Sequence, residues 1–425
     1  MNENEFKNEN EYGSERENAK EAEAPVAEGA ASVSEAETPE APAENRAEDP
    51  DAAPADAIEV SAEGAEDPTA VPADAVPPTE EEIREGEKKS VGKIASRVGL
   101  FVTVLYLAWL VLARTSMEIF AYFVAPLSTA FGWSTADISS CIRLFVNVAA
   151  MFAAAMIARP LLPKTSAMPR GKFGFGRVLC ALGASVVLVM ITAPLGSSFH
   201  YMWDLLTGVG SGAGVESNPW AMLLFAGIAT PIVEELIFRR FLLGRLRPLG
   251  EGIAIVISSA IFAVFHMNFT QLFFTFFCGL VWGWVYCRSG KFWHVCFLHI
   301  AYNTVYGLLL PYLTEWSAIA QEQIFSVNGA LKPAEILPFL GNLLIISAWV
   351  RVLTVTVALA VLGVIALSRT LPKLKLEKSE LSLTRKETLR AVFSASGFIA
   401  MLLVLAIYFV SRVTGTEALS LLLYR

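Results

Sequence analysis

Long apolar runs separated by short polar segments fill the chain from residue 99 to residue 412. An α-helix needs about 20 apolar residues to cross the ~30 Å hydrocarbon core of a membrane. The pattern therefore predicts an all-α fold, a polytopic transmembrane bundle of about eight or nine spans. The candidate spans are residues 99–126, 142–158, 178–195, 218–238, 252–267, 270–287, 292–312, 338–368 and 391–412.

The composition agrees with this fold class. Of the 425 residues, 54% are hydrophobic and 17% are charged, whereas soluble domains carry about 25% charged residues. We therefore expect a multi-pass protein of the cell membrane that has the lipid bilayer as a partner. We expect no nucleic-acid partner.

Residues 1–90 differ from the rest of the chain. They are rich in Ala, Glu and Pro, and their 27 acidic and 7 basic residues give a net charge of −20, while residues 91–425 carry +12. High charge with few apolar side chains to bury predicts disorder. We therefore expect a disordered acidic tail at 1–90 and a membrane domain at 91–425.

Basic residues accumulate in every second loop. They lie at 159–177, directly after the fourth span, at 288–291 and at 369–390, whereas the loops between them carry acidic residues. Because loops rich in Lys and Arg face the cytoplasm, the alternation predicts that the N-terminus is cytoplasmic.

The fourth span contains charged residues that an apolar helix rarely carries. Glu234 and Glu235 follow a long apolar run, and Arg239 comes four residues after the second acid. A charged side chain at the centre of a membrane helix costs about 2.5–3.5 kcal/mol, so it indicates a functional site. Glu235 and Arg239 share a helix face, which predicts a structural ion pair. Glu234 points about 100° away from Glu235, so we assign Glu234 to the reaction.

Two later apolar segments supply candidate partners for these acids. One ends at His266, and the other carries His299 and Asn303 four residues apart on one face. Peptide hydrolysis needs a base that activates water and donors that stabilise the oxyanion. Glu234 suits the base, His266 suits a group that orients the water, and His299 with Asn303 suit the oxyanion donors.

A zinc site is the alternative that these residue types leave open. Glutamate plus two histidines is a zinc hydrolase set, with His266 and His299 as the metal ligands. The usual His-Glu-x-x-His motif is absent, because the two histidines come from separate helices. The spacing leaves open whether zinc is a cofactor.

Together, these residues resemble the three motifs of the CPBP intramembrane proteases, which include the type II CAAX prenyl endopeptidases. The motifs run from Pro231 to Arg239, as Phe262-x-x-x-His266, and as His299-x-x-x-Asn303, and the resemblance covers about residues 217–307. One departure is Arg240, where the family commonly has Gly. The resemblance implies an all-helical membrane core, endopeptidase activity, and the candidate catalytic residues Glu234, Glu235, His266, His299 and Asn303.

We therefore predict an endopeptidase that cuts peptide or protein substrates, including lipid-modified ones, near the cytoplasmic membrane face. A catalytically silent immunity or scaffolding protein of the same family would keep the helices without needing Glu234 as a base. A proton-coupled transporter with Glu234 and His266 as its relay is the second alternative, although the chain has no inverted repeat of the motif segment.

Overall fold

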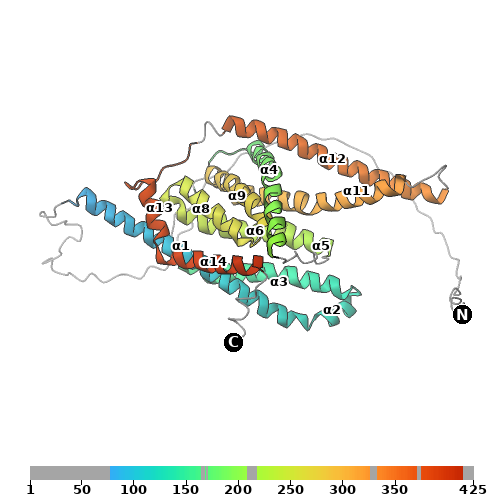
Figure 1. The fold of residues 1–425 in the computed structure, drawn as a ribbon, viewed down its shortest axis with the longest axis horizontal. Helices are drawn as coiled ribbons and strands as arrows, with labels where there is room; N and C mark the ends of the chain where they lie inside the picture. Colours follow the sequence, from blue (N-terminus) through green and yellow to red (C-terminus); the bar gives the residue numbers. More distant parts are fainter. Residues whose placement is uncertain are drawn as a thin grey trace, which may run out of the picture. The chain divides into compact units, whose positions relative to one another are not determined.

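The computed structural model describes residues 77–163, 168, 171–207, 218–325, 333–370 and 375–414. These residues form helices joined by short connections, with no strand among them, which confirms the predicted all-α fold (Figure 1). The elements are α1 (Glu80–Ala121), α2 (Val124–Phe131), α3 (Thr135–Ala158), η1 (Arg159–Leu161), α4 (Phe175–Thr207), α5 (Pro219–Ala221), η2 (Met222–Ala229), α6 (Thr230–Glu235), η3 (Leu236–Leu243), α7 (Gly244–Leu246), η4 (Arg247–Leu249), α8 (Glu251–Phe265), α9 (Phe269–Ser289), α10 (Phe292–Tyr302), η5 (Asn303–Leu309), α11 (Leu310–Phe325), α12 (Pro333–Thr370), α13 (Arg385–Phe393) and α14 (Ser396–Thr414).

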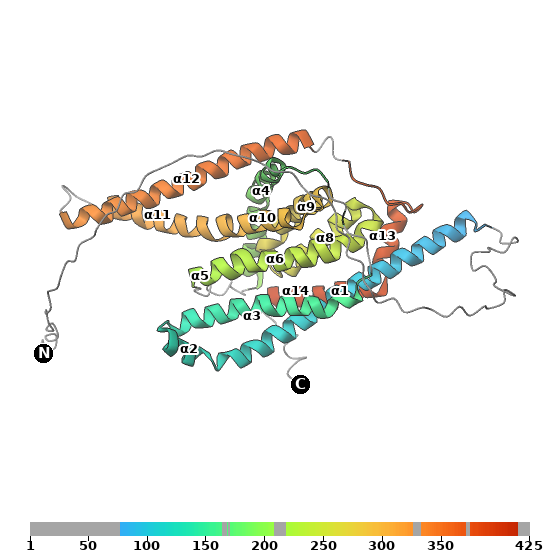
Figure 2. The same cartoon turned by 180° about the vertical axis from the view of Figure 1, so that it is seen from behind.

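Eight helices among the described residues are long and apolar enough to cross a membrane (Figure 2). They correspond to eight of the nine predicted spans, and the remaining one, at 252–267, forms the shorter helix α8. The prediction of about eight or nine spans is thus confirmed. The fourth span is a continuous helix from Pro219 to Leu249, in which α-helical and π-helical turns alternate before a final 3-10 turn, η4.

Helix α1 begins earlier than the sequence suggested. Thr79 and Glu82 form a capping box, in which the Thr79 hydroxyl accepts from the Glu82 N–H and the Glu82 carboxylate accepts from the Thr79 N–H. This motif satisfies the free N–H groups at a helix start. The predicted tail boundary at residue 90 therefore falls inside α1 and is corrected to Glu80. Residues 1–76 of the predicted tail lie outside the described residues.

Glycines allow the helices to approach closely at their crossings. A Cβ atom at Gly99 would meet the backbone of Gly397 where α1 crosses α14, and one at Gly183 would meet Gly363 where α4 crosses α12. Gly279 on α9 lies in the same way against α8. Small residues are the usual means by which membrane helices pack backbone to backbone. The last crossing packs α9 against α8 at Ser259.

The four loops predicted to be cytoplasmic contact one another at one end of the bundle, which agrees with the alternating charge pattern. At the opposite end, Asn218 donates to Asp137 at 2.9 Å, beside the loops that carry acidic residues. The contacts between the basic loops are Arg245–Pro163, Arg288–Glu251 and Arg247–Glu377. At the same end, Glu87 of α1 accepts from Ser382 of the last of these loops.

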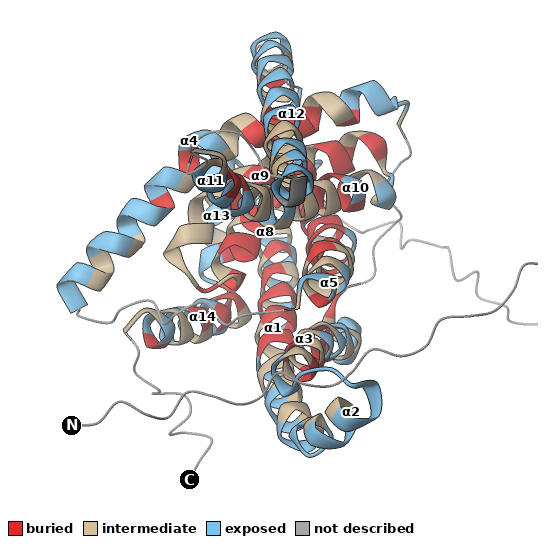
Figure 3. Cartoon of the chain, turned by 90° about the vertical axis from the view of Figure 1, so that its right-hand side faces the viewer, coloured by how far each residue is buried: buried red, intermediate tan, exposed pale blue. Residues whose placement is uncertain are grey.

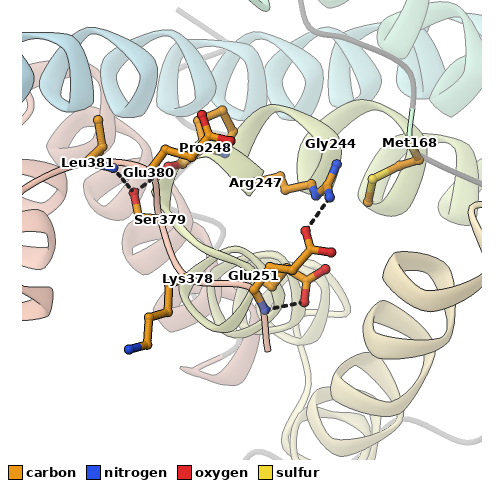
Figure 4. A pocket seen from close by; sticks show the side chains of 10 residues that line it. Met168, Gly244, Arg247, Pro248, Glu251, Lys378, Ser379, Glu380 and Leu381 are labelled. Carbon is orange, nitrogen blue, oxygen red and sulfur yellow. Dashed lines mark hydrogen bonds and ion pairs between the residues drawn. The ribbon is translucent and has the colours of Figure 1, made fainter. Parts of the chain in front are cut away.

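The linker before α13 crosses the start of α8. The Glu377 N–H donates to the Glu251 carboxylate at 2.9 Å, and the Glu251 N–H donates to the Glu377 carbonyl at 3.1 Å. The Ser379 hydroxyl donates to the Pro248 carbonyl at 2.8 Å. A pocket of about 280 Å³ lies at this crossing, lined by both segments (Figure 4). The linker therefore ties the end of the fourth span and the start of α8 to the C-terminal helices.

Helix α12 presents mostly exposed or partly exposed residues (Figure 3). Only 6% of its most apolar 18-residue window is buried within the protein. Its exposed side chains are nonetheless apolar, for example Leu337, Leu344 and Val357. In a membrane protein the lipid tails are as apolar as leucine, so such a face is solvated by hydrocarbon.

Candidate active site

The two acids of the fourth span lie in its buried middle. They end the short helix α6, which has a π-helical segment on each side, η2 before it and η3 after it. π-helical turns within α-helices occur frequently at functional sites. Glu234 is 8% exposed and Glu235 is fully buried. Both carboxylates are therefore held in the protein interior, where each needs a partner.

Glu235 and Arg239 lie together, as their spacing predicted. Arg239 Nε is 3.1 Å from Glu235 Oε2, and both side chains are at most 1% exposed. The contact is an ion pair by distance, but it lacks hydrogen-bond geometry, and among the described residues neither Nη atom of Arg239 has a hydrogen-bond partner. The guanidinium instead lies 4.5 Å from the centre of the Phe262 ring. A desolvated cation over an aromatic face is a favourable contact.

The imidazole of His299 lies between the two carboxylates. Its Nδ1 is 3.0 Å from Glu235 Oε1, and its Nε2 is 3.5 Å from Glu234 Oε2. Both acids therefore contact one imidazole, although their spacing points them about 100° apart on the helix. The two ring nitrogens lie on different sides of the imidazole, so a single ring contacts acids on different faces of α6.

Trp282 covers this group of residues, although its sequence context did not mark it as a site residue. Its ring centre lies 4.5 Å from that of His299 and 5.8 Å from the Arg239 guanidinium carbon. Trp282 is 2% exposed, and its indole N–H donates to Ser185 on α4 at 3.0 Å. The available signal was its position between the packing glycines 279 and 283, which places a large side chain on the packed side of α9.

His266 lies at the end of α8, beside the same aromatic side chains. Its Nδ1 is 2.8 Å from the Phe262 carbonyl, and its ring meets the Phe262 ring edge-on at a centre distance of 4.8 Å. Because a carbonyl can only accept, Nδ1 carries the proton in the neutral ring, and Nε2 presents a lone pair. His266 thus joins the cluster through Phe262, which also contacts Arg239 and His299.

Asn303 faces the fourth span instead of contacting His299. Its side-chain N–H donates to the Ala226 carbonyl in η2 at 3.1 Å. An amide nitrogen has two N–H groups, so this bond uses one and leaves the other for a ligand. The bond also places the amide beside the helix that carries the two acids.

The candidate zinc ligands do not form a metal site. Catalytic zinc takes three protein ligands. The Nε2 of His299 faces Glu234 at 3.5 Å, and His266 reaches the cluster through the ring of Phe262. Within the described ranges, no three His, Cys, Asp or Glu side chains are grouped so that they could hold a metal ion. The residues present therefore do not fit zinc.

These observations define a membrane protein with an acid–histidine cluster buried inside its helical bundle. Residues 216–305 match the family described as type II CAAX prenyl endopeptidase Rce1-like. The predicted resemblance to the CPBP family is therefore confirmed over this segment. All five candidate catalytic residues lie within the matched segment.

The segment is also similar to a bacterial protein from Bacillus subtilis (strain 168), "Putative membrane peptidase YdiL". The two sequences are 32% identical over 84 residues, which is 20% of this chain and 34% of the relative. The chain thus spans about a third of the length of the curated relative that it matches. No solved structure matches the chain.

Proposed function

We propose that this protein is an intramembrane endopeptidase that uses Glu234 and His266 to activate water, near the cytoplasmic face of the cell membrane. The observation that supports this proposal is the buried chain of contacts from Glu234 through His299 and Glu235 to Arg239, inside a segment that matches a peptidase family. The family match and the membrane location support a peptide or protein as the substrate class.

The charges of this cluster determine how many protons it holds. Two ionised glutamates and one arginine leave a net charge of −1, and an unbalanced charge in a water-poor interior is costly. One further proton balances the cluster. It belongs to Glu234 or to the Nε2 of His299, because Glu235 already pairs with Arg239 and with the Nδ1 of His299. Two groups this close titrate as a pair.

This shared proton provides both functions that hydrolysis requires. When it lies on His299, Glu234 is ionised and accepts a proton from water, while His266 Nε2 orients that water. The oxygen of the water forms a bond to the peptide carbonyl carbon, and the carbonyl oxygen becomes the oxyanion. The Nε2–H of His299 and the second N–H of Asn303 donate to the oxyanion. The C–N bond then breaks, and the proton held by Glu234 passes to the leaving amine.

Substitution of Glu234 tests this proposal. Glu234→Gln keeps the size of the side chain but removes the base, and base assistance contributes about 10²–10⁴-fold to turnover. We expect purified Glu234→Gln protein to cleave a peptide library slower by about that factor, with unchanged thermal stability. The control is Glu315→Gln, which changes an exposed acid on α11.

The result also separates the alternatives. Cleavage by Glu234→Gln at the wild-type rate would reject the base assignment. Absence of cleavage by the wild-type protein across lipid-modified and unmodified peptides would favour a catalytically silent immunity or scaffolding protein. Proton uptake coupled to solute transport in vesicles, abolished by Glu234→Gln, would favour the transporter.

A further inference from the structure

The connection between α8 and α9 is only three residues long, and His266 is the first of them. α8 ends at Phe265, and α9 begins at Phe269 with Asn268 as its N-cap. Met267, between His266 and Asn268, has a φ of 53° and is the one non-glycine residue in the described part of the chain with a positive φ. Such backbone conformations cost about 1–3 kcal/mol and persist only where the surrounding structure imposes them.

The side chain of Asn268 holds this strained connection in place. Its Nδ2 donates to the His266 carbonyl at 2.8 Å and to the Gln271 Oε1 at 2.7 Å, while its Oδ1 accepts from the Gln271 N–H at 2.8 Å. The partners fix the orientation of the amide, because a carbonyl only accepts and a backbone N–H only donates. The Oδ1 bond caps α9, and the Nδ2 bond restrains the backbone of His266.

These bonds restrain His266 from two directions. Asn268 binds its main-chain carbonyl, and the Phe262 carbonyl binds its ring Nδ1. These two bonds fix the direction of Nε2, which is the ring nitrogen left to contact a ligand. Removal of the Asn268 bond would let Met267 relax its positive φ, which would turn the preceding residue and its ring.

We propose that Asn268 is a positioning residue for His266, which sets the direction of Nε2 through the strained turn at Met267. The catalytic part of this inference rests on the proposed function, in which His266 orients the attacking water. The positioning itself is a property of the α8–α9 connection. The simpler interpretation is that Asn268 only caps α9, and the two interpretations differ in what Nδ2 does.

Asn268→Asp separates the cap from the positioning bond. Aspartate keeps an acceptor for the Gln271 N–H and is as good an N-cap as asparagine, but it has no N–H to donate to His266. Asn268→Ser is a second variant that keeps a capping oxygen. Gln271→Ala is the matched control, because it removes one acceptor of Nδ2 and leaves the bond to the His266 carbonyl.

Two readouts report on His266, measured on the full-length protein. The first is the rate at which diethyl pyrocarbonate modifies His266, measured by peptide mass spectrometry relative to His200 on α4. The second is peptide cleavage, with kcat and KM determined across pH. We expect Asn268→Asp and Asn268→Ser to keep the wild-type Tm and to speed the modification of His266. We expect kcat to fall, up to the ~10²-fold that a misplaced catalytic group causes, with an altered pH profile and little change in KM. Gln271→Ala should resemble the wild type.

The proposal is overturned if diethyl pyrocarbonate modifies His266 at the wild-type rate in both Asn268 variants. It is also overturned if Gln271→Ala changes that rate as much as the Asn268 variants do. If the wild-type protein cleaves no peptide, the proposed function fails on its own. The modification rates still decide whether Asn268 positions His266, because they do not depend on turnover.

Discussion

The ion pair of Glu235 and Arg239 permits a quantitative test of how the site is built. We consider Glu235→Gln, which keeps the shape of the side chain and an oxygen that accepts from His299 Nδ1. The substitution removes the negative charge beside the Arg239 guanidinium, which is 1% exposed. Among the described residues, Glu235 is the acid at ion-pair distance from Arg239. Breaking a buried pair from one side costs about 3–5 kcal/mol, because it leaves the other charge uncompensated.

The chain offers a control with the same spacing. Arg114 and Glu118 are also four residues apart on one helix, with Nε 3.2 Å from Oε1, but their side chains are 49% and 63% exposed. Exposed helix pairs of this kind contribute about 0.3–0.5 kcal/mol. Glu118→Gln should therefore destabilise the protein by a small fraction of the effect of Glu235→Gln.

The assay is the free energy of unfolding in detergent, measured for both variants and for the double variant Glu235→Gln/Arg239→Met. Removing both charges should recover much of the stability, since apolar replacement of a whole buried pair is often neutral or stabilising. Two results would refute the reasoning. One is equal destabilisation by Glu235→Gln and Glu118→Gln, and the other is a double variant less stable than Glu235→Gln alone.

Three further predictions concern the rest of the fold. Gly363→Ala places a Cβ against the backbone of Gly183. Because overpacking usually costs about 1–3 kcal/mol, we expect the free energy of unfolding in detergent to fall by that amount. Single cysteines at Ala130 and Lys378, in a cysteine-free background, should differ on intact cells, with an impermeant thiol reagent labelling Ala130→Cys alone; equal labelling would contradict the orientation. Hydrogen bonds from Thr384, with Arg84 nearby, lower the pKa of the Glu387 carboxyl from 4.5 to about 2. The lowered pKa means that the stability contributed by this carboxylate is complete above pH ~4.5 and is lost as the pH falls toward ~2. The stability difference between wild type and Glu387→Gln should therefore shrink over that interval, and a difference that grows would contradict the sign.

Local spacing predicted those parts of the site that one helix determines. Glu235 and Arg239 meet because residues four apart share a helix face, and the charge cost of burial marked both acids. The position of His299 between the acids depends on how α10 packs against α6, which is a property of two helices and not of either sequence segment. The same holds for Asn303 and its bond to Ala226. Trp282 was missed because a tryptophan in an apolar span resembles ordinary core.

The start of α1 was mispredicted for a different reason. The apolar pattern begins at Gly99, but the helix begins at Glu80, where the residues are mostly charged. The signal was present in the sequence as Thr79 followed by Glu82, a capping pair outside the apolar run. Charged residues then continue the helix because tertiary contacts hold it, such as the Glu87 bonds to Ser382.

The contact between α1 and α14, the first and last of the described helices, has a consequence for assembly in the membrane. Arg84 and Glu387 are separated by 303 residues along the chain, and Gly99 lies against Gly397 in the same region. Contacts between residues so distant in sequence form late, and chains are synthesised from the N-terminus. Helix α1 thus enters the bilayer before α14, and this face of α1 is covered only after α14 is in place. During synthesis, the glycine face of α1 is open to other membrane helices, so the interval before α14 arrives is the stage at which this protein is most prone to misassembly.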